Sequence, residues 1–284
     1  MELFQYASNP WGQEVLVRIS WSLFWLALGA GVLFVVGHLA LRGRWQGQHT
    51  ATAGGAGLPE KIERHGMGAR LFHWVMALSM LVLLITGFLP QIGVQFSWLT
   101  LHWVFGLVLV VSIVFHMIHA TVVLSFSDIW VSGRDVKEWL QGLRHDLTGS
   151  GEAPPKPGKY PVDHKMFHHA ATVGGLAAII TGVLMMFRIE DPIFPRDPYM
   201  YSDGTWGVIY VLHGIGGVLL VGLTITHVYF AILPEKRGIT RSMIKGWITR
   251  DEFLEHHDPE RWDVGEGDAD TDAAPSAAAV SEQG

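Results

Sequence analysis

Four stretches of this chain contain no Asp, Glu, Lys or Arg, and they constrain its fold more than any other feature. The longest covers 57 residues from Leu71 to Ser127, and the others are Ile19–Leu41, Met166–Phe187 and Gly204–Pro234. A membrane-spanning helix needs about 20 consecutive, mostly apolar residues. The longest stretch accommodates two such helices joined by a turn at residues 90–100. The sequence therefore predicts five membrane-spanning helices and excludes a soluble globular enzyme.

The predicted helices lie near residues 17–41, 70–89, 101–124, 166–188 and 206–233. We expect an all-α integral membrane protein in which the last four helices form a bundle, within a domain of residues 61–262. Residues 1–60 then contribute one extra N-terminal membrane-spanning helix and a linker. Residues 263–284 are acidic and Ala-rich without helical periodicity, so we expect a disordered tail.

The distribution of basic residues predicts the orientation of these helices. Under the five-helix arrangement, 17 of the 20 Lys and Arg residues lie on one side, at residues 42–70, 125–165 and 236–261. The other side holds only Arg18, Arg188 and Arg196. Because cytoplasmic loops carry an excess of Lys and Arg, we expect a bacterial-type inner-membrane protein with a periplasmic N-terminus and a cytoplasmic C-terminus.

Residues 135–147, between the third and fourth helices, have the pattern of an amphipathic helix. Their apolar residues form one helical stripe, with charged residues elsewhere: Val136, Trp139, Leu140, Leu143 and Leu147. Such a helix lies on a membrane surface with its stripe in the lipid. We therefore expect a cytoplasmic amphipathic helix in contact with membrane lipid. The alternative is a solvated connector.

Composition excludes several further classes. The chain has no cysteine, which rules out disulfides, Cys-ligated iron–sulfur clusters, thiolate-ligated haem and covalent C-x-x-C-H haem attachment. Its formal net charge of −6 argues against nucleic acid as a partner.

Histidines inside the predicted helices are the candidate functional residues, because ionisable groups within a membrane are costly. His213 and His227 are 14 residues apart, which corresponds to about 3.9 turns and a rise of about 21 Å on one helix face. One helix thus presents an imidazole near each membrane surface. By depth, His102 matches His213 on the outer side and His73 matches His227 on the inner side.

Two imidazoles from facing helices are suited to fill both axial positions of a haem iron, and such a haem transfers electrons. Two stacked haems would conduct electrons across the membrane. A competing arrangement exists, because His102 and His116 are also 14 residues apart. His116 is therefore an alternative to His73 as the inner ligand, and helix periodicity leaves the choice open.

The chain resembles the cytochrome b (gamma) subunit of respiratory formate dehydrogenase, within the wider dihaem b-type cytochromes that also serve nickel–iron hydrogenases. The resemblance covers about residues 63–262. Its motifs are Arg70-Leu71-Phe72-His73-Trp74, Leu101-His102-Trp103, Gly158-Lys159-Tyr160, Leu212-His213-Gly214, Thr226-His227-Val228-Tyr229, and a tail segment with His256-His257 and Arg261-Trp262.

The resemblance implies two haem b groups, the outer held by His102 and His213 and the inner by His73 and His227. This favours His73 over His116. It also implies a periplasmic iron–sulfur subunit and a molybdenum or tungsten subunit that oxidises formate, with this chain passing the electrons to quinone on the cytoplasmic side. This chain would not itself oxidise formate.

The sequence departs from the family in two regions besides the extra helix at 17–41. The stretch near the quinone differs at Pro161, Asp163 and His164. Several histidines are additional, and His38, His116 and His119 are candidates for a third haem. For quinone and its protons the candidates are Tyr160, Asp163, His164, His168 and His169.

Two rival functions remain. In the first, the same cytochrome serves a nickel–iron hydrogenase or another molybdoenzyme. A different class of function is a haem-free membrane transporter whose pathway is lined by histidines.

Overall fold

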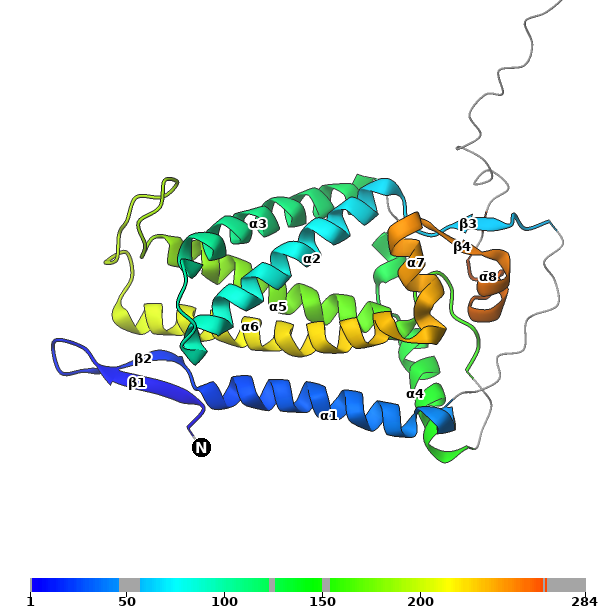
Figure 1. The fold of residues 1–284 in the computed structure, drawn as a ribbon, viewed down its shortest axis with the longest axis horizontal. Coiled ribbons are helices and arrows are strands. Elements are labelled where there is room, and N and C mark those ends of the chain that lie inside the picture. Colours follow the sequence, from blue (N-terminus) through cyan, green and yellow to red (C-terminus); the bar gives the residue numbers. More distant parts are fainter. Residues whose placement is uncertain (1, 46–56, 123–125, 150–153, 263, 265–284) are drawn as a thin grey trace, which may run out of the picture.

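The computed structural model describes residues 2–45, 57–122, 126–149, 154–262 and 264. Within them, five helices are long and apolar enough to cross a membrane, and all five extend between the same two ends of the molecule, with α2 inclined to α1 and α6 (Figure 1). They are α1 (Trp21–Trp45), α2 (Met67–Phe88), α3 (Trp98–Val122), α5 (Val162–Met186) and α6 (Asp203–Ile232). This confirms the predicted all-α, multi-pass membrane protein. The predicted disordered tail lies outside the described residues, apart from Val264.

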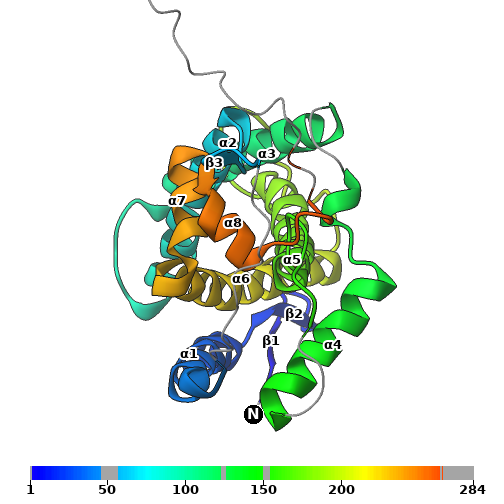
Figure 2. The ribbon, with the colours of Figure 1, turned by 90° about the vertical axis from the view of Figure 1, so that its right-hand side faces the viewer.

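Four of the long helices form two close pairs. Helix α2 packs along α3, and α5 packs along α6, whereas contacts between the two pairs are far fewer. Helix α1 lies outside this four-helix bundle against α6 (Figure 2). The interior between the two helix pairs is therefore the least tightly packed part of the bundle.

A β-hairpin precedes α1, and here the sequence prediction of a helix from residue 17 is wrong. Strands β1 (Phe4–Ser8) and β2 (Glu14–Ile19) pair antiparallel, and the helix begins only at Trp21. Gly12, with φ of +78°, forms part of the turn. The hairpin packs on α6 at Gly207, where a Cβ atom would collide with the Leu16 carbonyl oxygen. Tertiary packing thus decides the structure of residues that continue an apolar run. We call this end of the bundle the hairpin end.

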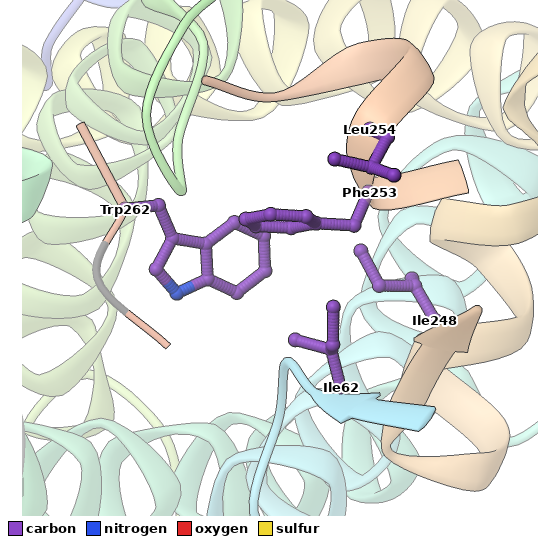
Figure 3. Close-up of a cluster of buried hydrophobic side chains, with 5 residues drawn as sticks. All are labelled: Ile62, Ile248, Phe253, Leu254 and Trp262. Atoms are coloured by element: carbon purple, nitrogen blue, oxygen red, sulfur yellow. The ribbon is translucent and has the colours of Figure 1, made fainter. Parts of the chain in front are cut away.

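The opposite end of the bundle carries a small cap that the sequence analysis did not predict. It consists of β3 (Lys61–Glu63), α7 (Arg237–Lys245), β4 (Trp247–Thr249), α8 (Arg250–His256) and residues 154–161 and 257–262. Strands β3 and β4 pair antiparallel although they lie far apart in the sequence. The cap encloses its own hydrophobic core, which Figure 3 shows as Ile62, Ile248, Phe253, Leu254 and Trp262. We call this end the cap end.

Helix α2 connects the cap to the bundle. Arg70 Nη1 donates a hydrogen bond to the Ile244 carbonyl at 2.8 Å, and Trp74 Nε1 donates one to the Met243 carbonyl at 2.9 Å. Both carbonyls belong to the last turn of α7. The cap therefore sits directly over the first turns of α2, next to His73.

Helix α4 (Gly133–Thr148) forms where the amphipathic helix was predicted and lies across the cap end (Figure 1). Its N-terminus has a capping box, in which the Ser132 hydroxyl accepts from the Asp135 amide and the Asp135 carboxylate accepts from the Ser132 amide. Lys165 on α5 donates to Asp135 at 3.1 Å. Its apolar stripe is exposed, at Val136, Trp139, Leu140 and Leu143.

Candidate functional site

At the hairpin end, one histidine from each helix pair faces the other. The rings of His102 on α3 and His213 on α6 have centroids 6.1 Å apart, with planes inclined by 68°. The two residues are 111 positions apart in the sequence, so only the packing of the bundle brings them together. We call them the hairpin-end pair.

Each ring of the hairpin-end pair is held at Nδ1 by a threonine. His102 Nδ1 lies 2.8 Å from Thr86 Oγ1, and His213 Nδ1 lies 3.1 Å from Thr181 Oγ1. Both threonine hydroxyls already donate to backbone carbonyls of their own helices, so they accept from the imidazoles. A ring whose Nδ1 carries the proton offers the lone pair of Nε2 to a metal. Both rings are thus prepared as neutral ligands.

A glycine follows each of these threonines and allows the imidazole to approach the helix. A Cβ atom on Gly87 would lie 3.5 Å from His102 Cε1, and one on Gly182 would lie 3.2 Å from His213 Cε1. The same Thr-Gly dipeptide therefore positions both rings, once from α2 and once from α5.

At the cap end, His73 on α2 and His227 on α6 form a second facing pair, which we call the cap-end pair. Their ring centroids are 6.1 Å apart and their planes are inclined by 51°. These rings pack on aromatic side chains, His73 on Trp74 at 5.3 Å and His227 on Phe167 at 4.9 Å. The predicted partners at both depths thus face each other.

His116, the alternative inner ligand, does not face His227 in this structure. Its ring stacks on Phe72, with centroids 4.2 Å apart, and lies 6.2 Å from the ring of His168. His38 on α1 hydrogen-bonds the Tyr229 hydroxyl at 2.6 Å, and His119 packs beside Gly68. Of the extra histidines, His116 on α3 and His168 on α5 face each other across two helices, and the ring of the adjacent His169 lies 5.8 Å from that of His168.

The facing pairs fit the axial ligands of a haem. Imidazole nitrogens bind metals at about 2 Å, so one iron between two rings is compatible with centroids about 6 Å apart. Within the described residues, no group of three or more His, Asp or Glu side chains is placed to hold a metal ion. Haem suits a two-histidine site because the porphyrin supplies the remaining four ligands.

Beside the cap-end pair, the cap holds a buried polar network. Arg64 donates from Nη1 to His257 Nε2 at 2.8 Å and from Nη2 to the Lys159 carbonyl at 2.9 Å. His257 Nδ1 donates in turn to the Gly158 carbonyl at 2.8 Å. Burial lowers the pKa of Arg64 to about 10, which leaves it charged at neutral pH. Burial and then the charge of Arg64 lower the pKa of His257 to about 3, so His257 is neutral.

His65 lies within this network and was missed by the sequence analysis. Burial first, and then the charges of Arg64, Lys159, His73 and His164, lower its pKa to about 3. Its ring is 6.4 Å from that of Tyr160, whose own pKa is raised by burial. His65, Tyr160 and His164 thus gather next to His73. The position of His65, two residues after β3, gave no periodic signal, because β3 forms only through pairing with β4.

The other residues predicted for quinone and protons, Asp163, His168 and His169, have different surroundings. His164 and Asp163 belong to the first turn of α5 rather than to a connector, and Asp163 is exposed. His169 donates from Nδ1 to the Lys165 carbonyl at 2.8 Å and packs on Trp130. His168 faces His116.

The family model described as prokaryotic cytochrome b561 matches residues 64–246. The formate dehydrogenase cytochrome b556 subunit of Haemophilus influenzae is 22% identical over 216 residues, which cover 71% of this chain and 82% of that protein. The matched family segment contains all the histidines of the hairpin-end and cap-end pairs.

Proposed function

Because this chain belongs to the prokaryotic cytochrome b561 family, we propose that it is a membrane electron-transfer subunit with two b haems. The family implies haem b. The hairpin-end pair would hold one haem and the cap-end pair the other. The observation that carries this proposal is the recurrence of one ring separation, 6.1 Å, at both depths of the bundle.

In this proposal, the chain's own residues hold and orient the haems. Thr86 and Thr181 fix the protonated Nδ1 of His102 and His213, so each ring presents Nε2. A haem held by two histidines would exchange electrons and would have no open position for substrate. The apolar helices keep water away from the interior between the two helix pairs. The chain therefore provides a path for electrons through a medium that excludes ions.

The electron donor is proposed from the relative whose name includes formate dehydrogenase. We infer that the hairpin end faces the periplasm and docks an iron–sulfur subunit, which receives electrons from a molybdenum or tungsten subunit that oxidises formate. The bias of Lys and Arg towards the cap end supports this orientation. A nickel–iron hydrogenase or another molybdoenzyme remains the alternative donor.

The acceptor is proposed to be a quinone bound at the cap end. Quinone reduction consumes two electrons and two protons, so its site needs hydrogen-bonding groups beside the electron carrier. His65, Tyr160 and His164 adjoin His73 and supply such groups. The exposed apolar stripe of α4 is proposed to rest in the lipid interface at this end.

A spectrum of the purified full-length protein tests the proposal. We expect a sharp b-type absorption band in the reduced-minus-oxidised difference spectrum, and a large fall in its amplitude when His73, His102, His213 and His227 are all changed to alanine, because the hairpin-end and cap-end haems are then lost. A haem-free histidine-lined transporter would give a flat trace. Such a trace from the wild-type protein would overturn the proposal.

Because the chain lacks cysteine, its orientation can be tested with single introduced thiols. Glu14→Cys in β2 and Glu255→Cys in α8 are matched exposed positions at the two ends. In intact spheroplasts, a membrane-impermeant maleimide should label Glu14→Cys and should not label Glu255→Cys until the membrane is opened. The reverse pattern would contradict the proposed orientation.

A further inference from the structure

The two helix pairs are repeats of one pattern. Helices α2 and α5 share the residues Phe-His near their starts and Ile-Thr-Gly near their ends, with a constant offset of 95 residues: Phe72 and Phe167, His73 and His168, Ile85 and Ile180, Thr86 and Thr181, Gly87 and Gly182. Both helices also begin at equivalent positions, Met67 and Val162.

Helices α3 and α6 complete the repeat with an offset of 111 residues. Their shared residues are Leu101 and Leu212, His102 and His213, Gly106 and Gly217, and His116 and His227. Each half of the bundle therefore carries a first-helix histidine, a Thr-Gly dipeptide and two histidines 14 residues apart. The two halves run in the same direction, as expected for repeats related by a two-fold axis along the bundle.

The repeat places the hairpin-end pair and the cap-end pair differently with respect to the pseudo-two-fold axis. His102 and His213 are equivalent residues, so the hairpin-end pair lies on the pseudo-two-fold axis and occurs once. His73 and His227 are not equivalent to each other, so the cap-end pair lies off the axis and must have a counterpart. The residues equivalent to His73 and His227 are His168 and His116.

The structure brings this counterpart together with matching geometry. The rings of His116 and His168 have centroids 6.2 Å apart and planes inclined by 59°, against 6.1 Å and 51° for His73 and His227. The supporting stacks match as well, because Phe72 stacks on His116 as Phe167 stacks on His227. Sequence, depth and packing are thus all repeated.

We propose that His116 and His168 are the axial ligands of a third b haem, at the cap end. This inference rests on the proposed function, because it takes the cap-end pair to be a haem site.

His168 Nδ1 is buried and has no hydrogen-bond partner within the described residues, so hydrogen bonding does not explain its position. In the part of the chain that the structure describes, no third ligand joins this pair, which favours haem over a bare metal ion. A second one-electron centre at this depth would let the cap end hold both electrons that quinone reduction consumes.

Haem stoichiometry of the purified full-length protein tests the inference. The ratio of haem to protein, measured as the pyridine haemochrome, should be three for the wild type. His116→Ala, His168→Ala and the double variant should each give two, because both residues hold the same haem. His116→Gln, which keeps a polar side chain of similar size, should also give two. The matched controls His119→Ala and His169→Ala should keep three.

The outcomes separate this inference from the proposed function. A wild-type ratio of two that neither His116→Ala nor His168→Ala lowers would overturn the third haem and leave the two-haem cytochrome standing. A loss caused by His116→Ala but not by His168→Ala would overturn the pairing. A wild-type protein without haem would overturn the proposed function itself.

Discussion

The two ends of the bundle hold their histidines in different ways. At the hairpin end a single pair lies between the helix pairs, and each ring is tied to a threonine hydroxyl that is itself fixed to the backbone. At the cap end two pairs lie at one depth, their rings pack on aromatic side chains, and a folded cap with half-buried His65 and buried His257 adjoins them. The rigid end is suited to passing electrons alone. The end with titratable groups is suited to coupling electrons to protons.

The largest expected effect comes from removing a histidine of the hairpin-end pair. His102→Ala and His213→Ala should each remove the hairpin-end haem, with a larger loss of haem affinity than the about 10–100-fold that is typical when only a hydrogen-bond partner of a ligand is removed. Haem content and the rate at which a reduced donor reduces the remaining haem measure this. His145→Ala on α4 should leave both unchanged. Unaltered haem content in the double variant His102→Ala/His213→Ala would contradict the assignment.

The next largest effect should come from removing the threonine hydroxyls that bond His102 and His213. Thr86→Ala should weaken the hairpin-end haem by about 10–100-fold and raise its midpoint potential, because a ring without a hydrogen-bond acceptor is a weaker donor to ferric iron. Thr181→Ala should do less, since His213 Nδ1 also lies 3.0 Å from the Ala178 carbonyl. Redox titration of the purified protein measures both.

Two controls belong to this threonine experiment. Thr86→Ser keeps the hydroxyl and should restore the wild-type potential. Thr121→Ala removes a hydroxyl that bonds the Met117 and Ile118 carbonyls and should have no effect. Equal shifts in Thr121→Ala and Thr86→Ala would mean that the threonines act only on helix packing.

The cap should lose stability in acid. His65 and His257 have a pKa of about 3 in the folded cap against 6.5 when exposed, so the unfolded cap binds more protons between these values. Stability is therefore complete above pH 6.5 and falls as the pH decreases, by about 1.4 kcal/mol per pH unit for each histidine.

Hydrogen exchange of the β3 and β4 amides at pH 7 and pH 5.5 measures this effect, after correction for the intrinsic exchange rate. Amides in the middle of α3 and α6, far from the cap, provide the internal reference and should keep their protection. His257→Gln should reduce the pH dependence. Cap protection that stays constant between the two pH values would contradict the burial of neutral histidines.

The smallest expected effect concerns the glycines beside the hairpin-end pair. Gly182→Ala should lower the temperature of haem release more than Gly87→Ala, because its Cβ would lie 3.2 Å rather than 3.5 Å from a ring carbon. Gly222→Ala on α6 has nothing within 4 Å of the new Cβ and should be neutral or slightly stabilising. The opposite order for Gly182 and Gly87 would argue against close packing of these rings.

Much of the bundle was predictable. The five long helices begin and end within four residues of the predicted bounds, because the cost of charge in lipid is set locally, along about 20 residues. The depths of His102 and His213, and of His73 and His227, followed from helical rise alone. The Thr-Gly dipeptides were visible in the sequence, although their role was not, since a threonine in a helix ordinarily bonds its own backbone.

The cap and the hairpin were not predictable by the same reasoning. Ile62 and Ile248 pack together although 186 positions separate them in the sequence. Each belongs to a strand of only three residues, which is too short to show an alternating pattern of apolar and polar residues. The hairpin likewise depends on a contact with a residue far along the chain, because Leu16 packs against Gly207 on α6.

The sequence by itself determined which segments enter the membrane and how deep each histidine lies, because partition between water and lipid and the rise of a helix are local properties. Only the tertiary structure decided which histidines face each other, with His73 opposite His227 and His116 opposite His168. Helix periodicity fixes the face of one helix, whereas the choice of neighbour depends on how the two helix pairs pack, and that is a property of the whole bundle.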